Sequence, residues 1–125
     1  MINLVIDKVT PSQNEWDYMP MYKRIELRND WIWLVRKAIG RNYGNHYANG
    51  KRSMQIISYR PRKLDVQNLE GGLKQIEDIL TRPKGLKNYG WGLLVDDSPK
   101  YLHRKQTIQI TDTQNPRTEI IIEDI

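Results

Sequence analysis

The chain has 125 residues, which fits one domain with its own core and is too short for two. It contains no Cys, which excludes disulfides, zinc–cysteine sites and thiol chemistry, and its two His are too far apart for a local metal motif. The net charge of +5 favours an anionic partner such as nucleic acid. Because no long apolar run and no signal-like N-terminus are present, we expect a cytoplasmic protein without a membrane segment.

Hydrophobic patterns separated by turn-forming residues predict seven elements. In chain order they are a strand over residues 2–9, a helix over 31–41, a strand over 53–59, a helix over 68–80, a strand over 91–95, and final strands over 101–110 and 118–123. Asp30 is the expected N-cap of the first helix, and Asn115-Pro116 predicts a hairpin between the last two strands. This order predicts one α/β domain of the α+β type over residues 1–125. We expect a single mixed, largely antiparallel sheet with two main helices on one face.

Asp65 and Asn68 stand at the start of the second predicted helix, where the partly positive helix end stabilises anionic groups. Each residue is also an ordinary N-cap. The sequence leaves both roles open.

Lys74 lies four residues after Glu70 and four before Asp78, so the three share one flank of that helix. One interpretation is a surface ladder of ion pairs, each worth about 0.3–0.5 kcal/mol. The other directs Lys74 at a scissile phosphate, whose developing charge the ammonium would offset.

The adjacent Gly71 and Gly72 weaken the same helix by about 1 kcal/mol each relative to Ala. Such a pair predicts that another backbone comes close. The partner is a neighbouring strand, a second subunit or a nucleic-acid strand.

Asp96 and Asp97 end a short apolar strand, and in strand geometry their side chains point to opposite faces. We expect one of them to reach the carboxylate near the start of the second helix, because carboxylates from two elements can share one cation. A plain polar turn is the alternative.

Basic residues surround this acidic group along the chain and would hold phosphates near it. A solvated surface is the other reading of the same charges. The residues are Arg60, Arg62, Lys63, Arg82, Lys84, Lys87, Lys100, Arg104 and Lys105.

Taken together, these residues resemble the RusA-like Holliday junction resolvases, a family common in phages and prophages. The resemblance covers most of the chain and begins with a P-S-x-N turn at Pro11, Ser12 and Asn14. Its most specific part is the pattern D-x-D-N, a spacer, K-x-x-x-D-x-L, and later an apolar strand ending in D-D. The matching positions are Asp65, Gln67, Asn68, Lys74, Asp78, Leu80, Asp96 and Asp97.

Two departures from the family pattern matter. Gln67 replaces the second acid, and the spacing from Asn68 to Lys74 is longer by about one helical turn. Losing a carboxylate should weaken cation binding without abolishing it, since magnesium is often held by one or two carboxylates with water and substrate phosphates. Asp78 and Glu70 are the residues that would compensate.

The resemblance implies a homodimer, encoded by a phage or prophage and acting in a bacterial host. It would resolve four-way DNA junctions by cutting two strands symmetrically. Mg²⁺ is the implied cofactor, with Mn²⁺ as a substitute, and neither a membrane nor a small-molecule cofactor is implied. Asp65, Lys74 and Asp97 would be catalytic, with Asp65, Asp97, Asp96 and Gln67 around the metal. The basic residues would contact the DNA backbone.

The leading hypothesis is therefore a crossover junction endodeoxyribonuclease. The alternative is a catalytically weakened or inactive junction-binding protein of the same fold, which the neutral Gln67 motivates. A third class is a phage interaction protein without a role on nucleic acid.

Overall fold

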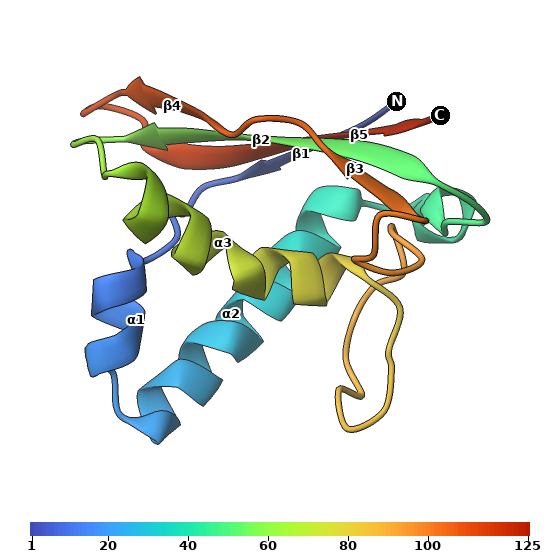
Figure 1. Cartoon of the computed structure of the whole chain (residues 1–125), viewed down its shortest axis with the longest axis horizontal. Helices are drawn as coiled ribbons and strands as arrows, with labels where there is room; N and C mark the ends of the chain where they lie inside the picture. Colours follow the sequence, from blue (N-terminus) through green and yellow to red (C-terminus); the bar gives the residue numbers. More distant parts are fainter.

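One mixed sheet of five strands, covered on one face by three helices, organises the computed structural model, which describes residues 1–125 (Figure 1). The elements are β1 (Ile2–Ile6), α1 (Gln13–Tyr18), α2 (Met21–Ile39), the 3₁₀ turn η1 (Tyr43–His46), β2 (Arg52–Arg60), α3 (Val66–Leu80), β3 (Leu102–Arg104), β4 (Ile108–Thr111) and β5 (Arg117–Asp124). The predicted α+β class is confirmed. No helix is long and apolar enough to cross a membrane.

Strand β2 lies at the centre of the sheet. Strand β5 pairs antiparallel with β2 along one edge and with β1 along its other edge. On the other side of β2, β3 and β4 both run parallel to it, one after the other. The predicted hairpin between the last two strands is wrong, because β4 and β5 flank β2 instead of pairing with each other. The predicted strand 101–110 is also interrupted where Lys105 turns its N–H to the carbonyl of Met54.

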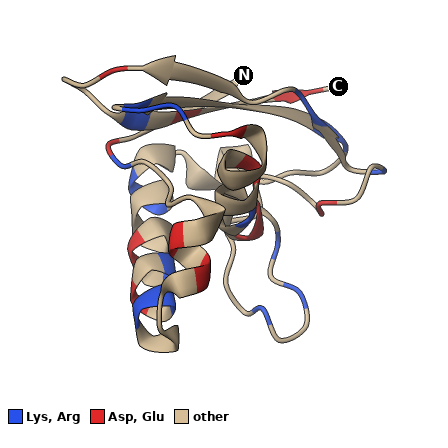
Figure 2. Ribbon diagram, turned by 60° about the vertical axis from the view of Figure 1, so that its left-hand side comes forward, with Lys and Arg blue, Asp and Glu red and all other residues tan.

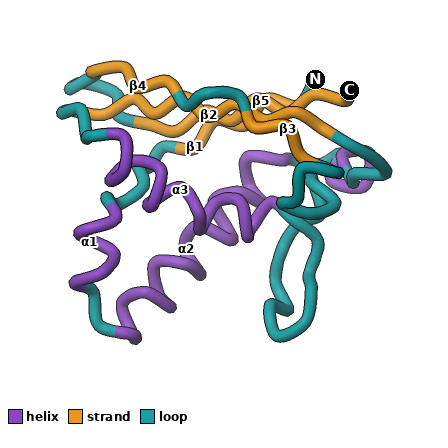
Figure 3. The backbone as a smooth tube through the Cα atoms, in the orientation of Figure 1, coloured by secondary structure: helices purple, strands orange, loops and turns teal.

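The core lies between the inner face of the sheet and the two longer helices. Figure 3 shows both helices on the same side of the sheet. Alternate residues of the strands point inward, and α3 contributes an apolar stripe at helical spacing. The buried residues include Leu4, Ile6, Met54, Ile56, Ile120 and Ile122 from the sheet, Leu69, Leu73, Ile76 and Leu80 from α3, and Trp31, Val35 and Ile39 from α2. Burial of these side chains is the main term that holds α3 against the sheet.

Two helical segments differ from the prediction. Helix α1 falls where a turn was expected, and Ser12 and Glu15 cap it reciprocally, with the Ser12 Oγ accepting from the Glu15 N–H at 3.0 Å. Helix α2 begins at Met21 after Pro20, well before Asp30. In its first half Met21, Tyr22 and Ile25 are exposed and only Leu27 packs against the core, so the sequence there shows little apolar periodicity.

The glycine pair of α3 faces the segment that leads into α1. A Cβ on Gly72 would overlap the carbonyl oxygen of Pro11, and one on Gly71 would overlap the side chain of Gln13. The predicted close approach of a backbone is therefore confirmed, and the partner is a segment of the same chain.

The chain between α3 and β3 contains no regular strand, so the predicted strand 91–95 is wrong. A single bridge joins Thr81 to Leu94, and Leu93 and Leu94 are buried. The chain thus returns to the C-terminal end of α3, which decides where Asp96 and Asp97 lie.

Candidate functional site

Helix α3 separates the two halves of the predicted metal site. Asp65 is its N-cap, whereas Asp97 lies beside its last turns, where its charge acts on Asp78. At about 1.5 Å per residue, the helix places these ends roughly 20 Å apart along its axis. The predicted sharing of one ion by Asp65 and Asp97 is therefore wrong within a single chain.

The Asp65 carboxylate is engaged in capping. It accepts hydrogen bonds from the backbone N–H of Asn68 at 3.1 Å and from the Asn68 side-chain amide at 2.6 Å. These bonds, the side-chain bond first, lower the pKa of Asp65. The Asn68 Oδ1 in turn accepts from the N–H of Asn14 at 3.1 Å, which joins the starts of α3 and α1.

Gln67, predicted to support the metal, lies in the exposed first turn of α3. It is therefore at the Asp65 end of the helix and not with Asp96 and Asp97.

Four acidic residues gather instead around the last turns of α3, and we call Glu77, Asp78, Asp96 and Asp97 the acidic cluster. The Arg104 guanidinium joins its two segments, binding Glu77 at 2.5 and 3.0 Å and donating to the Asp97 carbonyl at 2.9 Å. The acidic cluster thus combines carboxylates from one end of a helix with carboxylates from a distant segment, as predicted. The helix end is the C-terminal end of α3, whereas the prediction placed the site at the N-terminal end.

Asp78 is half-buried, as are Glu77 and Asp96, whereas Asp97 is exposed. Burial raises the pKa of Asp78 above its ordinary value, Lys87 opposes this shift, and the charge of Asp97 adds to it. The carboxylates of Asp78 and Asp97 therefore act on each other, and a cation between them would relieve their repulsion.

Asp96 has a different environment. Its carboxylate accepts the Asp97 N–H at 2.8 Å and lies 3.5 Å from the Lys84 ammonium. The pKa of Asp96 is lowered, first by that backbone hydrogen bond and also by Lys84. It is thus an ionised neighbour of the Asp78–Asp97 pair.

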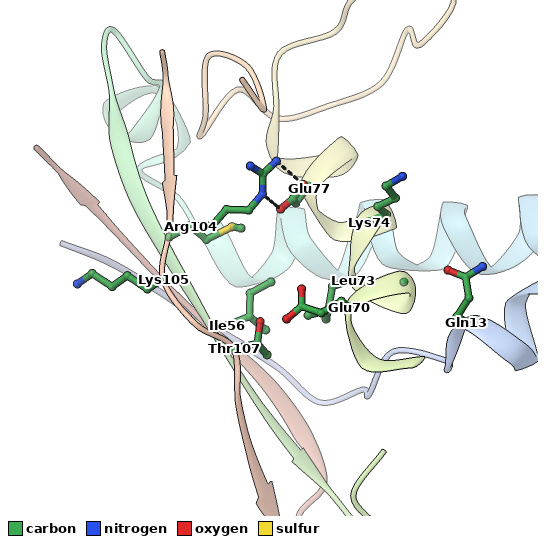
Figure 4. A pocket seen from close by; sticks show the side chains of 11 residues that line it. Gln13, Ile56, Glu70, Leu73, Lys74, Glu77, Arg104, Lys105 and Thr107 are labelled. Carbon is green, nitrogen blue, oxygen red and sulfur yellow. Dashed lines mark hydrogen bonds and ion pairs between the residues drawn. The ribbon is translucent and has the colours of Figure 1, made fainter. Parts of the chain in front are cut away.

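Lys74 lies in a groove of about 380 Å³ beside the acidic cluster, between α3 and the strands. Figure 4 shows Glu70 turned toward Thr107, while Lys74 extends outward from the helix. Glu77 and Arg104 form the end of the groove that borders the acidic cluster. Lys74 and Arg104 both line this groove.

Six of the nine predicted DNA-contacting residues are exposed: Arg62, Lys63, Lys84, Lys100, Arg104 and Lys105. Of these, Lys84 lies 3.5 Å from the Asp96 carboxylate. Figure 2 shows where Lys and Arg lie along the chain, including those on the projecting loop after α3. Arg104 is held by Glu77.

The other three predicted contacts are engaged within the protein. Arg60 is buried, 6% exposed, and donates to the Thr10 carbonyl at 2.8 Å, so its predicted contact with DNA is wrong. Arg82 donates to the Ala48 carbonyl, and Lys87 donates to the Asp78 carbonyl and the Thr81 hydroxyl. Arg82 and Lys87 thus hold the loop after α3 in place.

The predicted donor set does not fit a magnesium ion, because Asp65 and Gln67 lie away from Asp96 and Asp97. No group of three or more His, Asp or Glu side chains in residues 1–125 is placed to hold a metal. Asp78 and Asp97 are the two carboxylates of the acidic cluster whose charges act on each other most directly at the end of α3. Mg²⁺ is commonly held by one or two carboxylates together with waters and substrate phosphates.

Glu77 was missed by the sequence analysis. Its contact with Arg104 joins residues 27 positions apart, and no local pattern signals such a pair. Comparison with protein-family models and with curated proteins gave no match.

Proposed function

We propose that this protein is a magnesium-dependent, structure-selective endodeoxyribonuclease of the RusA-like type. It would bind four-way DNA junctions as a homodimer in the cytoplasm of a bacterial host and hydrolyse two opposed strands. The observation that supports the proposal is that the charges of Asp78 and Asp97 act on each other at the end of α3. This end lies one helical turn from Lys74 and beside Lys87.

In this proposal Asp78 and Asp97 hold Mg²⁺, and Asp96 supports them. When bound, the ion supplies polarisation of the phosphodiester and activation of water. Lys74 offsets charge on the non-bridging phosphate oxygens, and Arg104 is fixed for the same purpose by its bidentate contact with Glu77.

The exposed cations suit backbone contacts that select DNA by shape. Such contacts do not depend on sequence, and each neutralised phosphate adds about −0.9 to the slope of log affinity against log salt. A two-fold symmetric dimer would match the two-fold symmetry of a four-way junction.

A junction-binding protein without cleavage is the second candidate. The position of Asp65 favours it, because this carboxylate caps α3 and lies away from Asp97. In that case the acidic cluster would only orient Arg104 and Lys87.

Incubation with a synthetic four-way junction, and with a linear duplex of the same sequence, tests the proposal. With Mg²⁺ or Mn²⁺ the wild type should nick the junction and spare the duplex, and chelation should stop the reaction. Asp78→Asn and Asp97→Asn should each reduce nicking by about 100-fold. The matched control Asp7→Asn, an exposed aspartate at the end of β1, should retain it. Junction binding without nicking in either metal would instead support the second candidate.

A homodimer allows one other arrangement, in which Asp65 of one subunit meets Asp97 of its partner. Mixing Asp65→Asn with Asp97→Asn separates the two versions of the site. If the site is shared, each variant alone is inactive and mixed dimers regain activity. If Asp78 is the partner of Asp97, the Asp65→Asn variant is active by itself.

A further inference from the structure

The segment after α3 projects from the body of the protein as an arm, which we define as residues 82–90 (Figures 1 and 3). Its tip is a tight turn in which Lys84 and Lys87 exchange backbone hydrogen bonds of 2.8 and 3.1 Å. Gly85 has φ of 60° there, a conformation that favours glycine. The next residue, Leu86, is 105% exposed.

Contacts at its base hold the arm in position. The Arg82 guanidinium lies 4.8 Å from the centre of the Tyr47 ring, and that of Arg28 lies 4.8 Å from the centre of the Tyr89 ring. The Lys87 ammonium is bonded to the Asp78 carbonyl. Leu86 is therefore presented to water by a braced turn, although an apolar side chain gains free energy by leaving water.

The charge around Leu86 points to a polyanion. The arm contains three cations, Arg82, Lys84 and Lys87, and no Asp or Glu. Arg82 and Lys87 are bonded to carbonyls at its base, and the Lys84 ammonium lies 3.5 Å from Asp96, which follows the arm. The Lys84 side chain, next to the tip, is 77% exposed. An apolar side chain flanked by cations is the device with which DNA-bending proteins enter a base step, using Leu among other residues.

We infer that the arm is a wedge, in which Leu86 inserts between base pairs at the branch point of bound DNA while Lys84 contacts the neighbouring phosphates. The inference rests on the proposed function, because it requires a junction to be bound. The branch point interrupts the continuous stack of a duplex, so insertion there disrupts less stacking than insertion within an arm of the junction.

The test uses two four-way junctions that carry 2-aminopurine, a base analogue that fluoresces more strongly when unstacked. One has the analogue beside the branch point and the other has it midway along an arm. Saturating wild-type protein in chelator, which prevents cleavage, should increase the fluorescence of the first junction only. Leu86→Ala should reduce that increase by about threefold or more, and Leu86→Met, which keeps an apolar wedge, should restore most of it.

Met21→Ala is the matched control, because Met21 is an exposed apolar residue on α2 and should leave the signal unchanged. Melting temperatures should be equal for all variants, since neither side chain is buried. Junction binding with the same fluorescence in wild type and Leu86→Ala would overturn the wedge and leave the proposed function standing. That result would indicate that Leu86 instead enters an apolar pocket on a protein partner. Failure of the wild type to bind the junction would overturn both.

Discussion

Asp65 and Asp97 lie at opposite ends of α3, the first as its N-cap and the second beside Glu77 and Asp78. The residues matched by the family pattern thus have different roles in one chain. Asp65 and Asn68 fix the start of the helix against α1, whereas the half-buried Asp78 and the exposed Asp97 are the carboxylates of the proposed cation site.

The capping role of Asp65 predicts a loss of stability in Asp65→Ala and near wild-type stability in Asp65→Ser, because Ser is also a good N-cap. The urea midpoint at neutral pH measures this. The folded pKa of Asp65 is lowered, so its contribution is present above the unfolded pKa and disappears as the pH falls through the folded value. The difference between wild type and Asp65→Ala should therefore shrink below about pH 4. Equal midpoints at pH 7 would contradict the capping role.

Gly72→Ala should destabilise the protein by about 1–3 kcal/mol, because the new methyl group would overlap the Pro11 carbonyl. The sign is informative, since Ala in a free helix would be more favourable than Gly by about 1 kcal/mol. Gly44→Ala is the control, as nothing lies within 4 Å of its added Cβ. Chemical denaturation of both variants measures the effect. A stabilising Gly72→Ala would mean that α3 does not pack closely on residues 11–13.

Substitutions of Arg60 and Lys63 should distinguish a cation that stabilises the fold from a cation that contacts DNA. Arg60→Gln leaves the Thr10 carbonyl without its buried donor, so we expect a loss of about 1–3 kcal/mol in stability. It should not change the salt dependence of junction binding. Lys63→Gln should do the reverse, lowering the salt slope by about 1 at unchanged stability. Denaturation curves and binding titrations at several salt concentrations check both, and a changed slope in Arg60→Gln alone would contradict the assignment.

Asp78 gives a prediction about pH and metal. Burial raises its folded pKa, Lys87 opposes this and Asp97 adds to it, so the folded state binds this proton more tightly than the unfolded state. Stability should therefore fall as the pH rises from the unfolded value of about 4 through the raised folded value. Asp78→Asn should be more stable than the wild type at pH 7, and the two should converge in acid.

Added Mg²⁺ completes this test. It should raise the melting temperature of the wild type and of Asp7→Asn, because a ligand that binds only the folded state stabilises it. It should not raise that of Asp78→Asn. Equal responses of all three proteins would place the ion elsewhere.

The fold was predictable where the pattern was local. Leu69, Leu73 and Ile76 recur at helical spacing and predicted α3, and the glycine pair predicted its close approach to another backbone. The Ser12–Glu15 capping box was also present in the sequence, but the turn residues around it concealed α1. The exposed first half of α2 offered little apolar periodicity.

The site was less predictable, because long-range contacts decide it. The sequence placed Asp97 after an apolar segment but did not show to which end of α3 that segment returns. The bridge from Thr81 to Leu94 and the contact of Arg104 with Glu77 determine this. Each of these two contacts joins residues that are distant in sequence. The residues between Thr81 and Leu94 include the arm, and no periodic pattern in the sequence predicts the path of its backbone.

Metal-dependent nicking of a four-way junction by the wild type and by Asp97→Asn tests the central claim most directly. We predict that the wild type cuts the junction in Mg²⁺, and that Asp97→Asn binds it with similar affinity but cuts about 100-fold more slowly. Equal cutting by the two proteins, or binding without cutting by the wild type in both Mg²⁺ and Mn²⁺, would contradict it.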